Sequence, residues 1–199
     1  MSKDPPSVPQ SSPNSEEVNR AHSRGERGAL SNPVRIVDYD AKWPALFERE
    51  AERLGSVLGS RALRIEHVGS TSVPGLAAKP VIDVLLIVAD SSDEAAYAPA
   101  LEAAGYRLGI REPGWHEHRL FHGPDTDLNL HVFSAGCPEI ERMLLFRNWL
   151  RENPADRELY ARTKLALATK QWAQVQDYAD AKTAVVEEIL ARARASENK

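Results

Sequence analysis

The sequence is poor in cysteine and has no long apolar stretch. Cys137 is its only cysteine, so no disulfide can form within the chain, which is typical of a protein from a reducing compartment. No stretch reaches the roughly 18 consecutive apolar residues that a transmembrane helix needs. The amino terminus lacks the apolar core of a secretory signal. We therefore expect a cytoplasmic protein that does not enter a membrane.

The sequence also lacks an excess of positive charge. Its formal net charge is −4, which argues against nucleic-acid binding driven by bulk charge, although a local basic groove is compatible with it. With 199 residues, of which 42% are hydrophobic, the chain suits one folded domain with an ordinary core.

Residues 1–31 lack the apolar side chains that a folded segment needs. Between Met1 and Leu30, the only aliphatic side chains larger than alanine are Val8 and Val18. Such a segment cannot bury enough apolar surface to offset the entropy lost on ordering. We therefore predict a disordered tail over residues 1–31 and a folded domain over residues 34–195.

Hydrophobic periodicity over the rest of the chain predicts an α+β fold. Apolar residues spaced by three and four indicate helices, and alternation or short apolar runs indicate strands. We expect a mixed sheet flanked by helices, with a helical carboxyl-terminal part. The predicted helices cover residues 43–58, 93–104, 138–152, 154–172 and 176–193, and the predicted strands cover residues 63–68, 81–88, 106–111, 119–121 and 128–133.

A Gly-Ser turn, Gly69-Ser70-Thr71-Ser72, separates the first two predicted strands. Glycine allows close backbone approach, and successive N–H groups of a turn form a concavity that binds anions. The turn is therefore a candidate phosphate site, although a polar turn that only connects two strands has the same composition. A Walker P-loop is excluded, because no Lys-Ser/Thr pair follows Gly75 and Pro80 prevents the required helix.

Asp83 interrupts an otherwise apolar strand. Burying a carboxylate costs several kcal/mol unless it is paired, protonated or bound to a metal. Asp83 is therefore a candidate metal ligand. A structural ion pair with Lys79, Arg119 or Lys182 is the alternative.

Several histidines raise the question of a metal site. The run from His116 to His118 has no further ligands at the spacing of a zinc site, and a single cysteine argues against structural zinc. Most of these histidines are more simply explained by hydrogen bonding. His131 differs, because strand alternation places it with Asn129 on the polar face of its strand.

The carboxyl-terminal helices carry several cations among apolar positions. Lys182 follows Tyr178 at i,i+4, a spacing that allows the lysine to reach a phosphate. A solvated helix face is the default interpretation for Lys182, and equally for Arg142, Arg147 and Lys164.

Five stretches resemble the GrpB family: EHVGSTSVPGLAAKPVIDVLL, WHEHRLF, LHVF, LLFRNWLRENP and YADAK. The resemblance covers roughly residues 34–193. Because that family is placed in the nucleotidyltransferase superfamily, the resemblance implies a small mixed sheet flanked by helices. It also implies a Gly-Ser turn that cradles a nucleoside triphosphate, beside strand acids that hold Mg²⁺. A similar domain is fused to dephospho-CoA kinase in some bacteria.

The resemblance also assigns residues. Gly69 and Ser70 match the Gly-Ser signature of the superfamily, and Asp83 matches the first acid of its Asp-x-Asp/Glu pair. Leu85 stands where the second acid is expected, and the third acid falls near Asn129 or His131. The resemblance therefore implies one Mg²⁺ held by Asp83 and substrate phosphates rather than the usual pair of metal ions.

Three hypotheses for function follow. In the first, the protein transfers a nucleotidyl group from Mg-NTP to a small molecule, with Asp83 on the metal and His131 as general base. In the second, the same residues retain a nucleotide or a CoA-like ligand without transfer. In the third, the protein is a scaffold that acts through its helices. The residues expected to contact the phosphates are Gly69, Ser70, Thr71, Lys79, Arg119 and Lys182.

Overall fold

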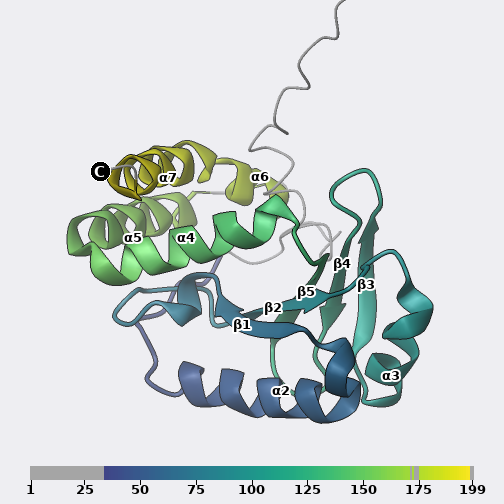
Figure 1. Ribbon diagram of the computed structural model, residues 1–199. Coiled ribbons are helices and arrows are strands. Elements are labelled where there is room, and N and C mark those ends of the chain that lie inside the picture. The colour runs from purple at the N-terminus through teal and green to yellow at the C-terminus, as the bar shows by residue number, and fades with distance from the viewer. Residues whose placement is uncertain (1–33, 171, 173–174, 198–199) are drawn as a thin grey trace, which may run out of the picture.

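The computed structural model describes residues 34–170, 172 and 175–197, which are built around one five-stranded sheet (Figure 1). The predicted disordered tail lies outside these residues. All five predicted strands are present, in the order β1-β2-β5-β4-β3. Strands β2 and β5 run parallel, and the other neighbours run antiparallel. The strands are β1 (Arg64–Val68), β2 (Ile82–Val88), β3 (Arg107–Glu112), β4 (His118–His122) and β5 (Leu128–Ser134).

Helices cover both faces of the sheet, so the expected α+β architecture with a helical carboxyl-terminal part is confirmed (Figure 1). Helices α2 and α3 lie against one face, and the carboxyl-terminal helices lie on the other side. The helices are α2 (Trp43–Leu58), α3 (Ala98–Ala103), α4 (Pro138–Glu152), α5 (Pro154–Ala168), α6 (Val175–Asp180) and α7 (Thr183–Glu197), and the short 3₁₀ turns are η1 (Gly59–Arg61), η2 (Ser70–Ser72) and η3 (Glu94–Ala96).

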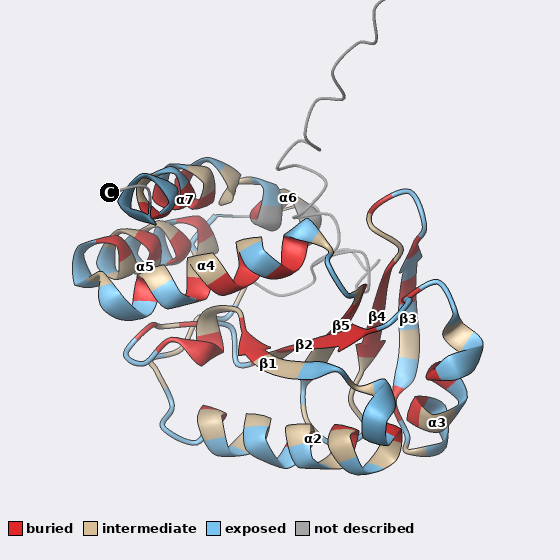
Figure 2. Ribbon diagram, viewed as in Figure 1, coloured by how far each residue is buried: buried red, intermediate tan, exposed pale blue. Residues whose placement is uncertain are grey.

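Strand β2 is apolar on both faces because both faces are covered. On one face, Val84 and Leu86 pack in a cluster with residues of α2 and α3. On the other face, Leu85 and Ile87 pack with residues of α4. Figure 2 shows the resulting concentration of buried residues in the central strands and on the inward sides of the helices. Asp83 belongs to the face that carries Leu85.

A third apolar cluster joins the carboxyl-terminal helices to the connection between β1 and β2. Val73 and Leu76 from this connection pack with residues of α4, α5 and α7. The connection is therefore held between the sheet and the helical part of the protein. This packing brings α4 and α5 close to the Gly-Ser turn.

Two predicted helices are interrupted. The helix expected over residues 93–104 forms as η3 and α3, with Pro99 in the first turn of α3, where its missing N–H leaves no hydrogen bond unmade. The last predicted helix, over residues 176–193, is divided into α6 and α7 by a turn at Ala181 and Lys182. Lys182 therefore lies at a junction between helices.

Within the described ranges, no helix is long and apolar enough to cross a membrane.

Candidate functional site

The Gly-Ser turn leaves β1 directly beside Asp83. Val68, the last residue of β1, pairs with Asp83, so Gly69 passes over the Asp83 side chain. Gly69 has a φ of 69°, and a Cβ at this position would lie 2.2 Å from Asp83 Oδ2. Only glycine allows both this left-handed backbone and this close approach. The two strongest candidates from the sequence therefore form one site.

Two hydroxyls of the turn hold its shape. Thr71 Oγ1 donates to the carbonyl of Val81 at 3.2 Å and lies 3.1 Å from His67 Nε2. Ser72 Oγ donates to the carbonyl of Gly69 at 2.6 Å. Thr71 and Ser72 are both buried. The side chain of Thr71, a residue expected from the sequence to bind phosphate, ties the turn to the start of β2.

Two arginines of α4 bind the backbone around the turn. Arg147 Nη1 donates to the carbonyl of His67 at 2.9 Å and to Glu66 Oε2 at 2.6 Å. Arg151 donates twice to the carbonyl of Ser72, at 3.0 and 2.7 Å. The LLFRNWLRENP stretch therefore holds the turn in place, and Arg147, which is buried, does not lie on a solvated helix face.

Lys164 of α5 is the residue that sequence analysis missed. Its Nζ donates to Ser70 Oγ at 2.9 Å and to the carbonyl of Ala77 at 2.6 Å, and it lies 4.7 Å from the centre of the Tyr160 ring. The residue is only 2% exposed. Burial and then the positive charge of Lys182 lower the pKa of Lys164 well below its usual value. A buried amino group thus faces the hydroxyl of the predicted phosphate-binding turn.

Lys182 repeats this arrangement from the junction of α6 and α7. Its Nζ lies 4.5 Å from the centre of the Tyr178 ring. Burial lowers the pKa of Lys182 to about 8, with Asp83 raising it and Lys79 lowering it further. Lys182, expected at the site, thus lies within electrostatic range of Asp83, and Lys79, also expected there, lies within electrostatic range of Lys182 with an exposed side chain.

The two lysines share a sequence signal. Tyr160 precedes Lys164 by four residues, as Tyr178 precedes Lys182, and in each pair the ammonium lies over the ring. The repeated spacing is visible in the sequence and would have identified Lys164. The amphipathic pattern of the helix, taken alone, predicted that the side chain of Lys164 is exposed to solvent.

Asp83 is held by two residues of β5. The parallel pairing of β2 with β5 sets Asp83 opposite Asn129, whose Nδ2 donates to Asp83 Oδ1 at 3.1 Å. His131 Nε2 lies 3.7 Å from the same oxygen. Burial lowers the pKa of His131, an effect that the Asp83 carboxylate partly reverses. The expected juxtaposition of Asp83, Asn129 and His131 is therefore observed.

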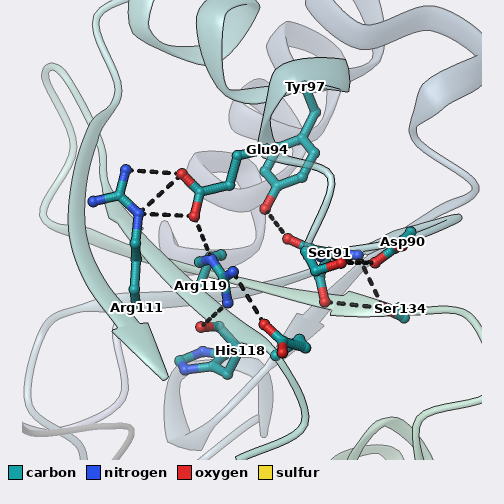
Figure 3. A network of polar contacts seen from close by, with 10 residues as sticks. Asp90, Ser91, Glu94, Tyr97, Arg111, His118, Arg119 and Ser134 are labelled. Carbon is teal, nitrogen blue, oxygen red and sulfur yellow. Dashed lines mark hydrogen bonds and ion pairs between the residues drawn. The ribbon is translucent and has the colours of Figure 1, made fainter. Parts of the chain in front are cut away.

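Arg119 lies apart from these residues. It pairs with Val132, so strand alternation directs it to the opposite face of the sheet from His131. Its guanidinium donates to Glu94 Oε1 at 2.6 Å and to Glu117 Oε2 at 3.1 Å (Figure 3). The sheet itself separates Arg119 from the Gly-Ser turn, so the geometry does not support its expected contact with the phosphates.

The donor set fits one magnesium ion and not two. The Asp83 side chain is 19% exposed, and a single carboxylate with substrate phosphates is a usual Mg²⁺ site. Leu85, at the position of the second acid, is fully buried in an apolar cluster. Among the residues that the structure describes, no group of three or more His, Cys, Asp or Glu side chains is arranged to hold a metal.

Comparisons with known proteins identify the family. Residues 33–192 match the GrpB protein family, and the chain therefore belongs to it. It is 57% identical over 186 residues to a UPF0157 protein of Halalkalibacterium halodurans, an alignment that covers 94% of this chain and 95% of the relative. The crystal structure of the conserved protein GrpB from Enterococcus faecalis superimposes with a TM-score of 0.73 at 34% identity, covering 83% of this chain and 100% of the other.

A further relative is a longer protein. The dephospho-CoA kinase of Mycolicibacterium paratuberculosis is 34% identical over 170 residues, which cover 72% of this chain and 42% of that protein. The similarity to this relative is therefore confined to less than half of its length.

Proposed function

We propose that this protein binds the phosphates of a nucleotide at the Gly-Ser turn and transfers a nucleotidyl group to a small molecule. One observation carries the proposal: Gly69 of the turn lies against Asp83, and Ser70 of the turn accepts a hydrogen bond from the buried amino group of Lys164. A carboxylate and a lysine that both contact a glycine turn suit a phosphate chain that carries a metal ion.

Each residue of the site has its own role in this proposal. Ser70 and the backbone of the turn hold phosphate oxygens. Lys164 and Lys182 supply positive charge, which in other nucleotidyltransferases comes in larger amount from a pair of metal ions. Asp83 holds one Mg²⁺, which when bound neutralises phosphate charge and polarises the phosphorus. Lys79, whose side chain is exposed, extends the positive charge toward solvent.

The transfer step needs a proton acceptor. The acceptor oxygen or nitrogen of the small molecule attacks the α-phosphorus of the NTP, the new bond to phosphorus forms, and pyrophosphate leaves. The proton of the attacking group passes to His131 Nε2, which burial keeps neutral. Catalysis then comes mainly from positioning and charge stabilisation, as is usual for phosphoryl chemistry.

A binding function without transfer is the second candidate. Leu85 favours it, because a buried leucine replaces the acid that would hold a second metal ion. In this case the same residues retain a nucleotide or a related phosphate ligand. Because one relative carries the name dephospho-CoA kinase, dephospho-CoA belongs in the ligand panel.

Thermal unfolding tests both candidates. Wild type is measured with ATP, GTP or dephospho-CoA, each in Mg²⁺ and in EDTA, beside Asp83→Asn and the exposed control Asp93→Asn. A ligand at 100 times its dissociation constant stabilises by about 2.7 kcal/mol, which is roughly 5–11 °C for a domain of this size. Release of pyrophosphate from NTP in the presence of candidate acceptors then separates transfer from binding.

The outcomes are distinct. A Mg²⁺-dependent shift that Asp83→Asn abolishes and Asp93→Asn retains supports the metal-nucleotide site. A shift that persists in EDTA without product supports the binding function. No shift with any of the ligands contradicts both.

A further inference from the structure

The hydroxyl of Tyr178 is buried and has no hydrogen-bond partner among the residues that the structure describes. Tyr178 belongs to α6 and is only 5% exposed. A buried polar group that makes no hydrogen bond costs free energy of folding, whereas phenylalanine fills the same space without that cost. The hydroxyl of Tyr178 therefore calls for a role other than stabilising the fold.

The contacts that hold Tyr178 in place are made by its ring. Lys182 Nζ lies 4.5 Å from the ring centre. The indole of Trp172 meets the ring at an interplanar angle of 71°, with ring centres 6.3 Å apart, and its own N–H donates to the carbonyl of Leu167 at 2.8 Å. Phenylalanine would keep these ring contacts, so they do not explain the hydroxyl.

Tyr178 is linked to the Gly-Ser turn through Tyr160. Burial raises the pKa of Tyr178, and Tyr160 raises it further, so the two phenols lie within electrostatic range of each other. Burial also raises the pKa of Tyr160 to about 12, an effect that a hydrogen bond with Ser70 partly opposes. Tyr178 therefore neighbours Tyr160, which in turn neighbours the turn.

Two pairs of a tyrosine and a lysine are thus present near the turn. Tyr160 and Lys164 form the first pair, and Lys164 donates to Ser70. Tyr178 and Lys182 form the second pair, and the two lysines lie within electrostatic range of each other. A phosphate at Ser70 meets the first pair. A second phosphate linked to it suits the second pair, because an ammonium and a phenol both donate to phosphate oxygens.

We propose that Tyr178 and Lys182 form a second phosphate subsite beside the Gly-Ser turn, in which the Tyr178 hydroxyl donates to the outer of two linked phosphates. The inference rests on the proposed function in placing the first phosphate at Ser70. It adds a substrate class, molecules that carry a pyrophosphate group. Tyr178 then determines specificity, because a single phosphate at Ser70 offers its hydroxyl no acceptor.

Titration calorimetry with inorganic pyrophosphate and inorganic phosphate, each with Mg²⁺, tests the subsite. Wild type is expected to bind pyrophosphate at least tenfold more tightly than phosphate. Tyr178→Phe keeps the ring beside Lys182 and removes the hydroxyl, so its affinity for pyrophosphate is expected to fall roughly tenfold. Its affinity for phosphate is expected to equal that of wild type.

Urea denaturation without ligand separates this role from a structural one. Tyr178→Phe breaks no hydrogen bond within the described part of the chain, so the midpoint is expected to stay the same or to rise. Tyr106→Phe makes the same change at a tyrosine that is 1% exposed and donates to Glu50 Oε2 at 2.7 Å. This control is expected to lower the midpoint and to bind pyrophosphate as wild type does.

The proposal fails if wild type binds pyrophosphate and phosphate equally, if Tyr178→Phe retains the wild-type affinity for pyrophosphate, or if Tyr178→Phe lowers the midpoint as Tyr106→Phe does. A nucleotide-dependent thermal shift that Tyr178→Phe retains in full refutes the subsite and leaves the proposed function intact. Conversely, pyrophosphate binding that depends on Tyr178, in a protein that shows no shift with any nucleotide, refutes the proposed function and leaves the subsite intact.

Discussion

Lys164 Nζ donates a hydrogen bond to Ser70 Oγ at 2.9 Å, although the two residues are 94 positions apart in the sequence. This contact joins the carboxyl-terminal helices to the turn between β1 and β2. A buried ammonium is costly unless its donors find acceptors, and here Ser70 and the carbonyl of Ala77 supply them. Both of these acceptors are neutral oxygens, and phosphate oxygens at the turn would add negatively charged acceptors for Lys164.

Replacing Lys164 tests its place in the site. Lys164→Met keeps the length of the side chain and removes the charge, so we expect the affinity for ATP to fall at least tenfold, about 1.4 kcal/mol. Titration calorimetry measures this change. Lys170→Met removes an exposed lysine two residues beyond the end of α5 and is expected to bind as wild type does. Equal affinities for both variants would exclude Lys164 from the site.

Binding of a phosphate ligand is expected to depend on pH through Lys182. Because the pKa of Lys182 is lowered to about 8, its charge is lost as the pH rises through that value. We expect ATP affinity to fall roughly tenfold between pH 7 and pH 9. In Lys182→Arg, which stays charged, the affinity should change much less over this range.

Destabilisation of the folded protein through Lys182 does not explain such a loss of ATP affinity at high pH. The unfolded chain binds more protons at Lys182 than the folded protein does between pH 8 and the ordinary pKa of 10.5. The contribution of Lys182 to the free energy of unfolding therefore rises with pH over this interval. A wild-type affinity that is the same at pH 7 and pH 9 would contradict the role of Lys182.

The close approach of Gly69 to Asp83 predicts a large effect of a small substitution. Gly69→Ala forces a Cβ to within 2.2 Å of Asp83 Oδ2 and also strains a backbone with a φ of 69°. We expect a loss of more than about 2 kcal/mol in the free energy of unfolding. Gly75→Ala has a similar backbone, with a φ of 77°, and no atom within 4 Å, so it should cost only about 1 kcal/mol. Urea denaturation of both variants measures the difference, and equal losses would refute the contact.

Glu139 in the first turn of α4 predicts a pH-dependent stability. Burial raises the pKa of Glu139 to about 7, partly opposed by Arg142. A group whose pKa is raised on folding stabilises the protein below its unfolded pKa and loses that contribution as the pH rises to about 7. We expect the free energy of unfolding to decline by up to about 3 kcal/mol between pH 4.5 and pH 8 through this residue.

Glu139→Gln removes the titrating group and keeps its shape. Its free energy of unfolding, from urea denaturation at pH 5 and pH 8, should decline less than that of wild type. Glu141→Gln, two positions after Glu139 and exposed, serves as the control. A wild-type decline that Glu139→Gln retains in full would contradict the prediction.

The local patterns of the chain determined much of the fold. Apolar periodicity and turn residues depend on neighbours in sequence, so the five strands and most helices were predictable from them. The Gly-Ser turn and Asp83 were identified for a similar reason. A glycine followed by hydroxyl residues and an acid within an apolar strand both depart from the local patterns of the chain. Because such departures cost stability, they indicate residues that serve a function.

Only the tertiary structure decided which of these residues meet. Strand pairing sets the face on which a side chain lies, which separates Arg119 from the turn and joins Glu112 to His118 and His131. Helix packing also places Lys164 beside Ser70. The sequence could not show this, because a lysine on an amphipathic helix is interpreted as solvent-exposed until its packing partner is known. The sequence thus determined the candidates one by one, and long-range pairing of strands and helices determined the site.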